Sequence, residues 1–181
     1  MRILSGSLKD AEIPFKPQPG LRPTPDRVRK AMIDTLQPWE GMRVLDLFSG
    51  TGALGLEAVS AGAASVVFVE SDRRRADEIA QLVRGLNLTG QCRVKKQDAW
   101  VALADLAGGD SFDRVLADPP YEKGLALKTL DFFKQGTCLN PGAWVVIETY
   151  KKEPLPDALG RLERRRSTPY GDTTLHYYSL V

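Results

Sequence analysis

The sequence predicts a doubly wound α/β fold, in which helices cover both faces of a mostly parallel sheet. From residue 43 onward, short apolar runs of strand length alternate with segments whose apolar residues have helical spacing, as in repeated βαβ units. The runs are continuously apolar, which is typical of strands buried on both faces. A glycine-rich turn also joins the first of these strands to its helix. Together these observations favour one α/β domain.

Composition limits the class of protein. The chain has 181 residues, of which 43% are hydrophobic and 27% charged, so it is long and apolar enough for one globular domain. No apolar run approaches the roughly 20 residues of a membrane-spanning helix. Cys92 and Cys138 belong to no paired-cysteine motif. We therefore expect reduced, buried thiols, no metal site, no membrane partner and a cytoplasmic protein.

The order of the predicted elements divides the chain into an extension and a main domain. Residues 1–40 form an N-terminal arm and helix, in which Thr24 is expected to cap the helix and Pro25 to occupy its first position. Residues 41–181 form the main domain, with helices expected near 53–61, 72–85, 100–106 and 124–135. Seven strands are expected, at residues 44–48, 65–70, 92–96, 114–117, 143–148, 162–167 and 173–180.

The turn after the first strand carries a nucleotide-binding pattern. Residues 46–55 read Asp-Leu-Phe-Ser-Gly-Thr-Gly-Ala-Leu-Gly, so Gly50, Gly52 and Gly55 satisfy Gly-x-Gly-x-x-Gly. Glu70 ends the next strand, where a carboxylate can accept hydrogen bonds from both hydroxyls of a ribose. Taken alone, this pattern fits either a dinucleotide or the adenosine of S-adenosylmethionine.

Two further carboxylates favour S-adenosylmethionine. Asp46 precedes the turn, where it can meet a cationic amino-acid group, directly or through water, and would repel a pyrophosphate. Asp98 follows the third strand, where it could accept from an adenine amine or simply cap the next helix. Because parallel strands end at one edge of the sheet, these side chains should lie together. The predicted cofactor-binding residues are Asp46, Phe48, Ser49, Gly50, Thr51, Gly52, Glu70, Ser71, Asp98 and Ala99.

A second motif, Asp118-Pro119-Pro120-Tyr121, directly follows the fourth strand. Pro120 restricts Pro119 to extended geometry, so the loop holds the Asp118 carboxylate and the Pro119 carbonyl as fixed acceptors. Tyr121 supplies an aromatic face on which a flat base can stack. The motif therefore predicts a site for the exocyclic amine of a base, with Asp118, Pro119 and Tyr121 as its catalytic residues.

These motifs resemble a known family of enzymes. Asp-Pro-Pro-Tyr is a signature of S-adenosylmethionine-dependent amino-group methyltransferases, and residues 20–29, 46–55 and 117–121 together resemble the RsmD family over essentially the whole chain. The resemblance implies the Rossmann-like class I methyltransferase fold with a seven-stranded sheet. It also implies methylation of the 2-amino group of one guanine in bacterial 16S ribosomal RNA, the family's guanine-966, on an assembling small ribosomal subunit.

Other classes of protein explain fewer of the motifs. A DNA adenine methyltransferase shares Asp-Pro-Pro-Tyr but normally needs a separate domain to read sequence, and a protein glutamine methyltransferase carries Asn at the position of Asp118. A nicotinamide-dependent dehydrogenase fits the glycine motif and Glu70 but leaves Asp-Pro-Pro-Tyr unexplained, as does a non-enzymatic binding module. The RNA guanine methyltransferase is therefore the leading hypothesis, with a DNA adenine or other amino-group methyltransferase as the alternative.

Basic residues near the N-terminus suggest an RNA-contacting surface. Residues 1–30 contain seven Lys and Arg residues against three acidic residues. Pairing with Asp26 and Asp34 is the competing explanation, but surface ion pairs contribute little and seldom need so many basic residues. The predicted RNA-binding residues are Arg22, Arg27, Arg29 and Lys30.

Overall fold

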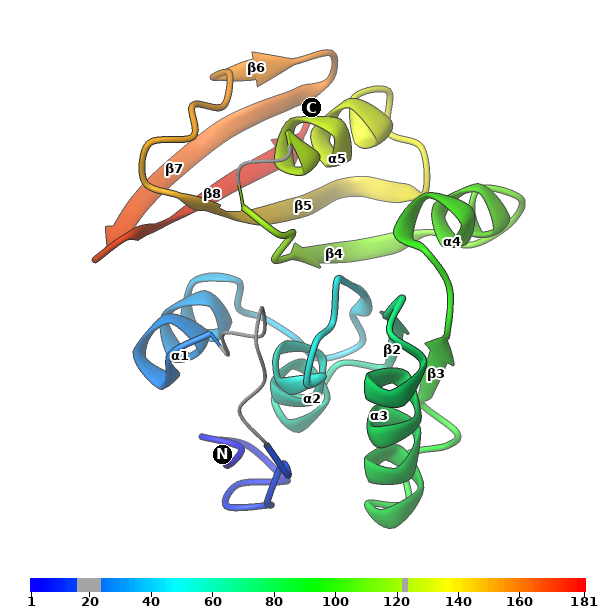
Figure 1. Ribbon diagram of the computed structural model, residues 1–181. Helices are drawn as coiled ribbons and strands as arrows, with labels where there is room; N and C mark the ends of the chain where they lie inside the picture. The colour runs from blue at the N-terminus through cyan, green and yellow to red at the C-terminus, as the bar shows by residue number, and fades with distance from the viewer. Residues whose placement is uncertain (16–23, 122–123) are drawn as a thin grey trace.

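The computed structural model describes residues 1–15, 24–121 and 124–181. In this part of the chain, eight strands form one sheet in the order β3-β2-β1-β4-β5-β8-β7-β6 (Figure 1). The strands are β1 (Arg43–Leu47), β2 (Ser65–Val69), β3 (Cys92–Lys95), β4 (Phe112–Ala117), β5 (Leu139–Tyr150), β6 (Ala158–Leu159), β7 (Leu162–Tyr170) and β8 (Thr173–Leu180). The helices are α1 (Asp26–Thr35), α2 (Ala53–Ser60), α3 (Arg73–Gly85), α4 (Ala99–Leu106) and α5 (Leu125–Phe133).

The sheet has a parallel half and an antiparallel half. Strands β1 to β5 pair in parallel, whereas β8 pairs antiparallel with both β5 and β7. The chain order reverses between β1 and β4, because β2 and β3 lie to one side of β1 and β4 and β5 to the other. Ligands of open α/β sheets bind outside the carboxyl ends of the strands at such a reversal. The predicted α/β fold, with helices on both faces of a mostly parallel sheet, is confirmed.

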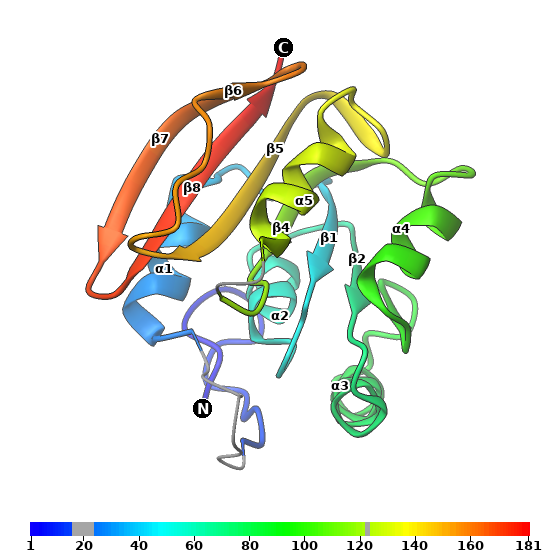
Figure 2. The same cartoon turned by 45° about the horizontal axis from the view of Figure 1, so that its top comes forward.

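Helices cover both faces of the sheet and bury two core clusters. Helices α1, α2 and α3 pack on one face, where Met32, Leu56 and Ile79 share a cluster with Phe68 and Val146. Helices α4 and α5 pack on the other face, on a cluster that includes Leu103 and Leu130. Figure 2 shows α4 and α5 in front of the sheet, with α1 and α2 behind it. Because α1 shares the core of the sheet, it is packed as part of the main domain; the boundary at residue 40 stays a prediction.

Three local expectations differ from the structure. The sheet has one strand more than predicted, because β6 is only two residues long and so short a strand has no detectable periodicity. Strand β5 begins at Leu139, four residues before the predicted start at residue 143, and its pairing with β4 is irregular there. Pro25, not Thr24, is the N-cap of α1, and no side chain caps that helix end.

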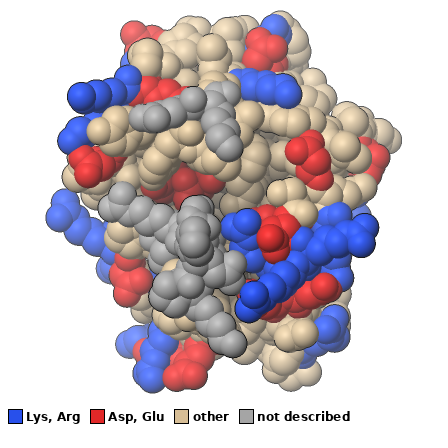
Figure 3. All heavy atoms as spheres, viewed as in Figure 1, with Lys and Arg blue, Asp and Glu red and all other residues tan. Residues whose placement is uncertain are grey.

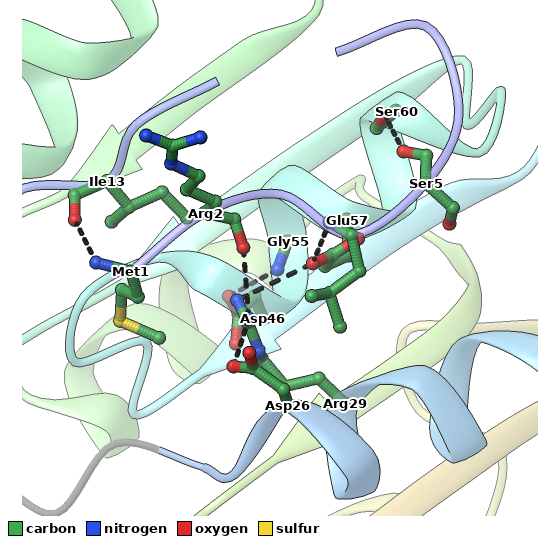
Figure 4. A network of polar contacts seen from close by, with 11 residues as sticks. Met1, Arg2, Ser5, Ile13, Asp26, Arg29, Asp46, Gly55, Glu57 and Ser60 are labelled. Carbon is green, nitrogen blue, oxygen red and sulfur yellow. Dashed lines mark hydrogen bonds and ion pairs between the residues drawn. The ribbon is translucent and has the colours of Figure 1, made fainter. Parts of the chain in front are cut away.

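The first residues form a short hairpin that lies against α2. Ile3 N donates to Ala11 O at 3.0 Å and Ile13 N to Met1 O at 2.8 Å, which holds the two arms of the hairpin together. Two polar side chains of α2 form hydrogen bonds with the hairpin backbone. Leu4 N donates to Glu57 Oε1 at 2.9 Å, and Ser60 Oγ donates to the carbonyl of Ser5 (Figure 4). The hairpin is therefore attached to the helix that follows the glycine-rich turn.

Two observations concern cysteine chemistry and membranes. Cys92 and Cys138 are both buried and unbonded, as predicted, and burial raises the pKa of both thiols. Of the helices in residues 1–15, 24–121 and 124–181, none combines the length and the apolar character that crossing a bilayer requires.

The buried side chain of His176 should make the free energy of unfolding depend on pH. Its buried ring lies 3.1 Å from Thr149 Oγ1 and 2.8 Å from Ser167 Oγ, and burial together with the charge of Arg164 lowers its pKa to about 4. The unfolded chain binds a proton on this ring below about pH 6.5, whereas the folded chain does not until about pH 4. The free energy of unfolding should therefore fall as the pH falls between those values, by at most about 3 kcal/mol.

Urea unfolding at about pH 7 and pH 5 checks this expectation. His176→Gln is the control, because it removes the titrating ring and should reduce the loss of stability between the two pH values. An equal loss in both proteins would assign the effect to other groups.

Candidate active site

A cavity of about 310 Å³ opens at the carboxyl ends of β1, β2 and β4. It lies where the chain order of the sheet reverses. Eleven of the thirteen predicted cofactor-binding and catalytic residues line it: Phe48, Ser49, Gly50, Thr51, Glu70, Ser71, Asp98, Ala99, Asp118, Pro119 and Tyr121. The structure thus brings the two motifs, separated by more than sixty residues, into one cavity.

The glycine-rich turn needs glycine at two positions, for two different reasons. Gly52 has a φ of +76° at the N-cap of α2, a conformation that favours glycine. At Gly55, an added Cβ would lie 2.3 Å from the Phe68 ring, so only glycine lets α2 pack this closely on β2. The helix therefore begins directly at the cavity.

Glu70 is held in place by the backbone around it. Its Oε2 accepts from Gly50 N and its Oε1 from Asp72 N, both at 2.8 Å. Each carboxylate oxygen can accept a further hydrogen bond, so the ribose-binding role predicted for Glu70 is compatible with these contacts.

Asp46 and Asp98 differ in how they relate to the cavity. Asp46 is buried behind the turn: its Oδ2 accepts from Gly55 N at 3.0 Å, and burial raises its pKa to about 7. It is not among the residues that line the cavity, so its contact with a cofactor stays a prediction. Asp98 does line the cavity, and its Oδ1 accepts from Trp100 N at 2.9 Å as the N-cap of α4. The capping role that the sequence left open is thus present.

Asp118 lies in a largely buried, acidic part of the cavity. Thr24 Oγ1 donates to Asp118 Oδ2 at 3.2 Å, which brings the segment before α1 to the Asp-Pro-Pro-Tyr motif. Burial and the negative charge of Glu148 together raise the pKa of Asp118 well above its usual value. A proton is therefore held more tightly here than on an exposed aspartate.

Tyr121 is fixed by its hydroxyl. This group donates to Glu148 Oε1 at 2.8 Å and lies 3.2 Å from Thr173 Oγ1. Its ring centroid is 6.3 Å from that of Tyr150, at an angle of 44°. Burial raises the pKa of Tyr121, so the phenol stays neutral and the ring is oriented by its hydrogen bonds.

The sequence analysis missed three side chains of this network. Thr24 was expected to cap α1, but it contacts Asp118 instead. Glu148 and Thr173 come from β5 and β8, and nothing in their spacing links them to Tyr121. Glu148 did carry a signal, because a carboxylate at the end of the apolar run 143–148 needs a partner when it is buried.

The predicted RNA-binding residues do not share one environment. Arg22 lies outside the described residues. Arg27 and Lys30 are exposed; Arg27 lies over the Tyr170 ring, 5.5 Å from its centroid, and Lys30 pairs with Asp34. The prediction for Arg29 is wrong.

Arg29 is fully buried between the hairpin, α1 and α2. Its Nη2 donates to Arg2 O at 3.0 Å and to Asp26 Oδ1 at 2.7 Å, and its Nη1 lies 3.5 Å from Glu57 Oε1 (Figure 4). A side chain with no exposed surface cannot bind RNA, so Arg29 has a structural role. The surplus of basic residues that suggested RNA binding did not account for the hairpin and α2 packing over Arg29.

Within the described ranges, no three His, Cys, Asp or Glu residues are grouped so that they could hold a metal ion.

The fold and motifs of this chain recur in known proteins. It is 31% identical over 179 residues to Ribosomal RNA small subunit methyltransferase D of Escherichia coli strain K12, which covers 98% of this chain and 89% of that protein. The counterpart in Haemophilus influenzae is 32% identical over 157 residues, or 86% of this chain and 81% of that one.

Solved structures show the same arrangement. The structure of yhhF from Escherichia coli superposes with a TM-score of 0.86 at 30% identity and covers 99% of this chain and 97% of that one. An RNA methyltransferase from Salinibacter ruber, solved in complex with S-adenosyl-L-homocysteine, shares the fold at a TM-score of 0.68 and 19% identity, over 88% of this chain and 94% of its own. The family model described as Conserved hypothetical protein 95 matches residues 1–179. The chain therefore belongs to the family of this model, which is the RsmD family that its motifs resemble.

Proposed function

We propose that this chain is an S-adenosylmethionine-dependent methyltransferase of small-subunit ribosomal RNA. One observation carries this proposal: a single cavity contains both the glycine-rich turn with Glu70 and the Asp118–Tyr121 motif. The names of its relatives in Escherichia coli and Haemophilus influenzae agree with an RNA substrate of this kind. The cofactor also agrees with the S-adenosyl-L-homocysteine bound by the structurally similar enzyme of Salinibacter ruber.

The finer proposal is that the methyl acceptor is the exocyclic 2-amino group of a guanine, on an assembling small subunit in the cytoplasm. Its support is the resemblance to the RsmD family and the pairing of a carboxylate with an aromatic ring at the end of β4. Asp118 can accept a hydrogen bond from an amine, and Tyr121 can stack on a base.

The residues of the cavity fit the proposed cofactor. Glu70 offers acceptors to ribose hydroxyls, and we assign the adenine to Asp98 and Ala99, which line the same cavity. When bound, S-adenosylmethionine supplies an electrophilic methyl group on a sulfonium.

The remaining chemistry belongs to the side chains of the acceptor site. The lone pair of a guanine 2-amino group is delocalised into the ring, so the amine is a weak nucleophile. Asp118 holds this amine by accepting one of its hydrogens and stabilises the positive charge that develops on nitrogen. Thr24 orients Asp118 through its hydroxyl, and Glu148 and Thr173 orient Tyr121. A paired base must first leave its stack to reach this site.

Mapping of methylated nucleotides in ribosomal RNA tests this function. RNA from cells with and without the gene should differ at one guanine of the small-subunit RNA. Purified protein should also transfer labelled methyl groups from S-adenosylmethionine to small-subunit RNA from the deficient cells. Transfer to DNA adenines and not to RNA would contradict the proposal and favour the DNA adenine methyltransferase.

Glu70→Ala should weaken S-adenosylmethionine binding while leaving the fold intact. Loss of hydrogen bonds to a charged acceptor costs about 1.5–3 kcal/mol, or roughly a tenfold to hundredfold loss of affinity. Titration calorimetry measures this change directly. Glu78→Ala on the exposed side of α3 is the control and should bind as the wild type does; equal affinity of Glu70→Ala and wild type would remove Glu70 from the cofactor site.

Glu148→Gln should extend activity to lower pH. Asp118 must be ionised to stabilise the positive charge that develops on the amine nitrogen, so the rate of methyl transfer falls as the pH falls through its raised pKa. Glutamine removes the negative charge that helps raise this pKa but keeps an acceptor for the Tyr121 hydroxyl. The midpoint of the single-turnover pH profile should therefore move to lower pH, whereas Tyr121→Phe, which keeps the charge, should leave it in place. An unmoved midpoint in Glu148→Gln would contradict the coupling.

A further inference from the structure

We propose that an exposed surface beside the active site binds the unpaired RNA nucleotides that adjoin the target base. This tyrosine–arginine surface consists of Arg27, Tyr150, Arg166 and Tyr170. The inference rests on the proposed function, because it takes RNA as the substrate. It names the part of the protein that holds the strand outside the catalytic cavity.

The surface is continuous with the catalytic tyrosine. Thr173 is the register partner of Tyr150 on β5 and of Tyr170 on β7. Paired residues of neighbouring antiparallel strands project to the same face, so these three side chains form one row across the sheet. The Thr173 hydroxyl at one point of this row lies 3.2 Å from the Tyr121 hydroxyl, and the Tyr121 and Tyr150 rings are neighbours. Aromatic rings therefore lead outward from the site where the target base is expected.

Cations lie along the same row. The Arg27 guanidinium lies over the Tyr170 ring. Arg166 precedes Tyr170 by four residues on β7, projects to the same face of the sheet and is paired in register with Tyr177. Both arginines are exposed, and neither forms an ion pair with any side chain in the described ranges. Their positive charge is thus available to phosphate groups.

A larger group of basic side chains elsewhere is mostly neutralised. Figure 3 shows Lys and Arg side chains gathered at the right of the molecule, around α3, with acidic side chains among them. Arg74 pairs with Glu78 at 3.2 Å, and Lys96 pairs with Asp77. These pairs compensate the charge, and no aromatic ring is stacked with either cation in the described structure.

The combination of rings and free cations fits a single strand of RNA. Bases of any sequence stack on aromatic side chains, and arginines neutralise the backbone between them. In a duplex the bases stack on each other and their faces are not accessible. We therefore expect the surface to prefer an unpaired strand over a duplex of the same length.

Binding of short RNA oligonucleotides tests the inference. Fluorescence anisotropy measures affinity for a single-stranded oligonucleotide and for its duplex, and steady-state kinetics measures KM and kcat on small-subunit RNA. Tyr170→Ala should weaken single-strand binding about tenfold and raise KM, with kcat and S-adenosylmethionine affinity unchanged. Tyr170→Phe keeps the ring and should restore the wild-type affinity. Arg27→Gln should lower the slope of log affinity against log salt by about one unit.

Arg74→Gln is the matched control, because it removes an arginine that is already paired, and its single-strand affinity should equal that of the wild type. Equal affinity of Tyr170→Ala, Arg27→Gln and wild type would overturn the inference, as would equal binding of duplex and single strand. If Tyr170→Ala does not fold, the salt slope of Arg27→Gln decides. Failure of the proposed function is a separate result, namely that the wild type transfers no methyl group to ribosomal RNA.

Discussion

Replacing Asp118 by alanine should reduce the rate of methyl transfer by about a hundredfold or more, with cofactor affinity unchanged. Deletion of one preorganised group that stabilises developing charge has an effect of about this size in other enzymes. Asp118 is a strong candidate for such a group because it lines the cavity and Thr24 fixes its orientation through a hydrogen bond of 3.2 Å. Its place in the Asp-Pro-Pro-Tyr loop puts it beside the expected acceptor base.

Single-turnover kinetics at saturating cofactor measures the Asp118→Ala effect without interference from product release. Asp98→Ala is the informative comparison, because Asp98 lines the part of the cavity assigned to adenine. It should weaken S-adenosylmethionine binding and leave the single-turnover rate at saturation nearly unchanged. A near-normal rate in Asp118→Ala would show that the acceptor amine is held by other groups.

Replacing Arg29 by alanine should destabilise the protein by about 3–5 kcal/mol. Removal of one partner from a buried ion pair leaves the other charge uncompensated, and here Glu57 would remain buried at 1% exposure. The alanine also removes the donor to Arg2 O, which helps to hold the hairpin. For a chain of this size the melting temperature should fall by on the order of 10 °C.

A second variant separates the charge from the volume of Arg29. In the double variant Arg29→Met, Glu57→Gln, both charges are gone and an apolar side chain fills the space, so much of the lost stability should return. Urea unfolding of the single and double variants provides the measurement. An Arg29→Ala variant as stable as the wild type would contradict this structural role.

The two functional motifs were recognisable because their chemistry lies in short, local segments. A glycine-rich turn needs its glycines within a few residues, as Gly52 and Gly55 illustrate, and the rigid Asp118–Tyr121 loop depends on adjacent prolines. The end of a parallel strand also has a predictable place, so Glu70 and Asp118 could be assigned to one edge of the sheet before the structure was known.

Long-range contacts could not be predicted in the same way. Thr24 reaches Asp118 across 94 residues, and Tyr121 reaches Thr173 across 52. Such contacts depend on the antiparallel pairing of β8 with β5 and on the packing of α1 against the sheet. The spacing of residues within one segment predicts neither of these arrangements. The same reason explains the error at Arg29, since a local surplus of basic residues does not show which of them other segments pack over.

The sequence by itself therefore determined the α/β fold and the family to which the chain belongs, and it predicted the two motifs that meet in the candidate active site. Each of these follows from periodicity, turn chemistry or a motif within a few residues. Only the tertiary structure decided which side chains support Asp118 and Tyr121, which arginine is buried and which remains free beside Tyr170. The physical reason is that burial and hydrogen-bond partners are properties of the packed chain, set by segments that are distant in sequence.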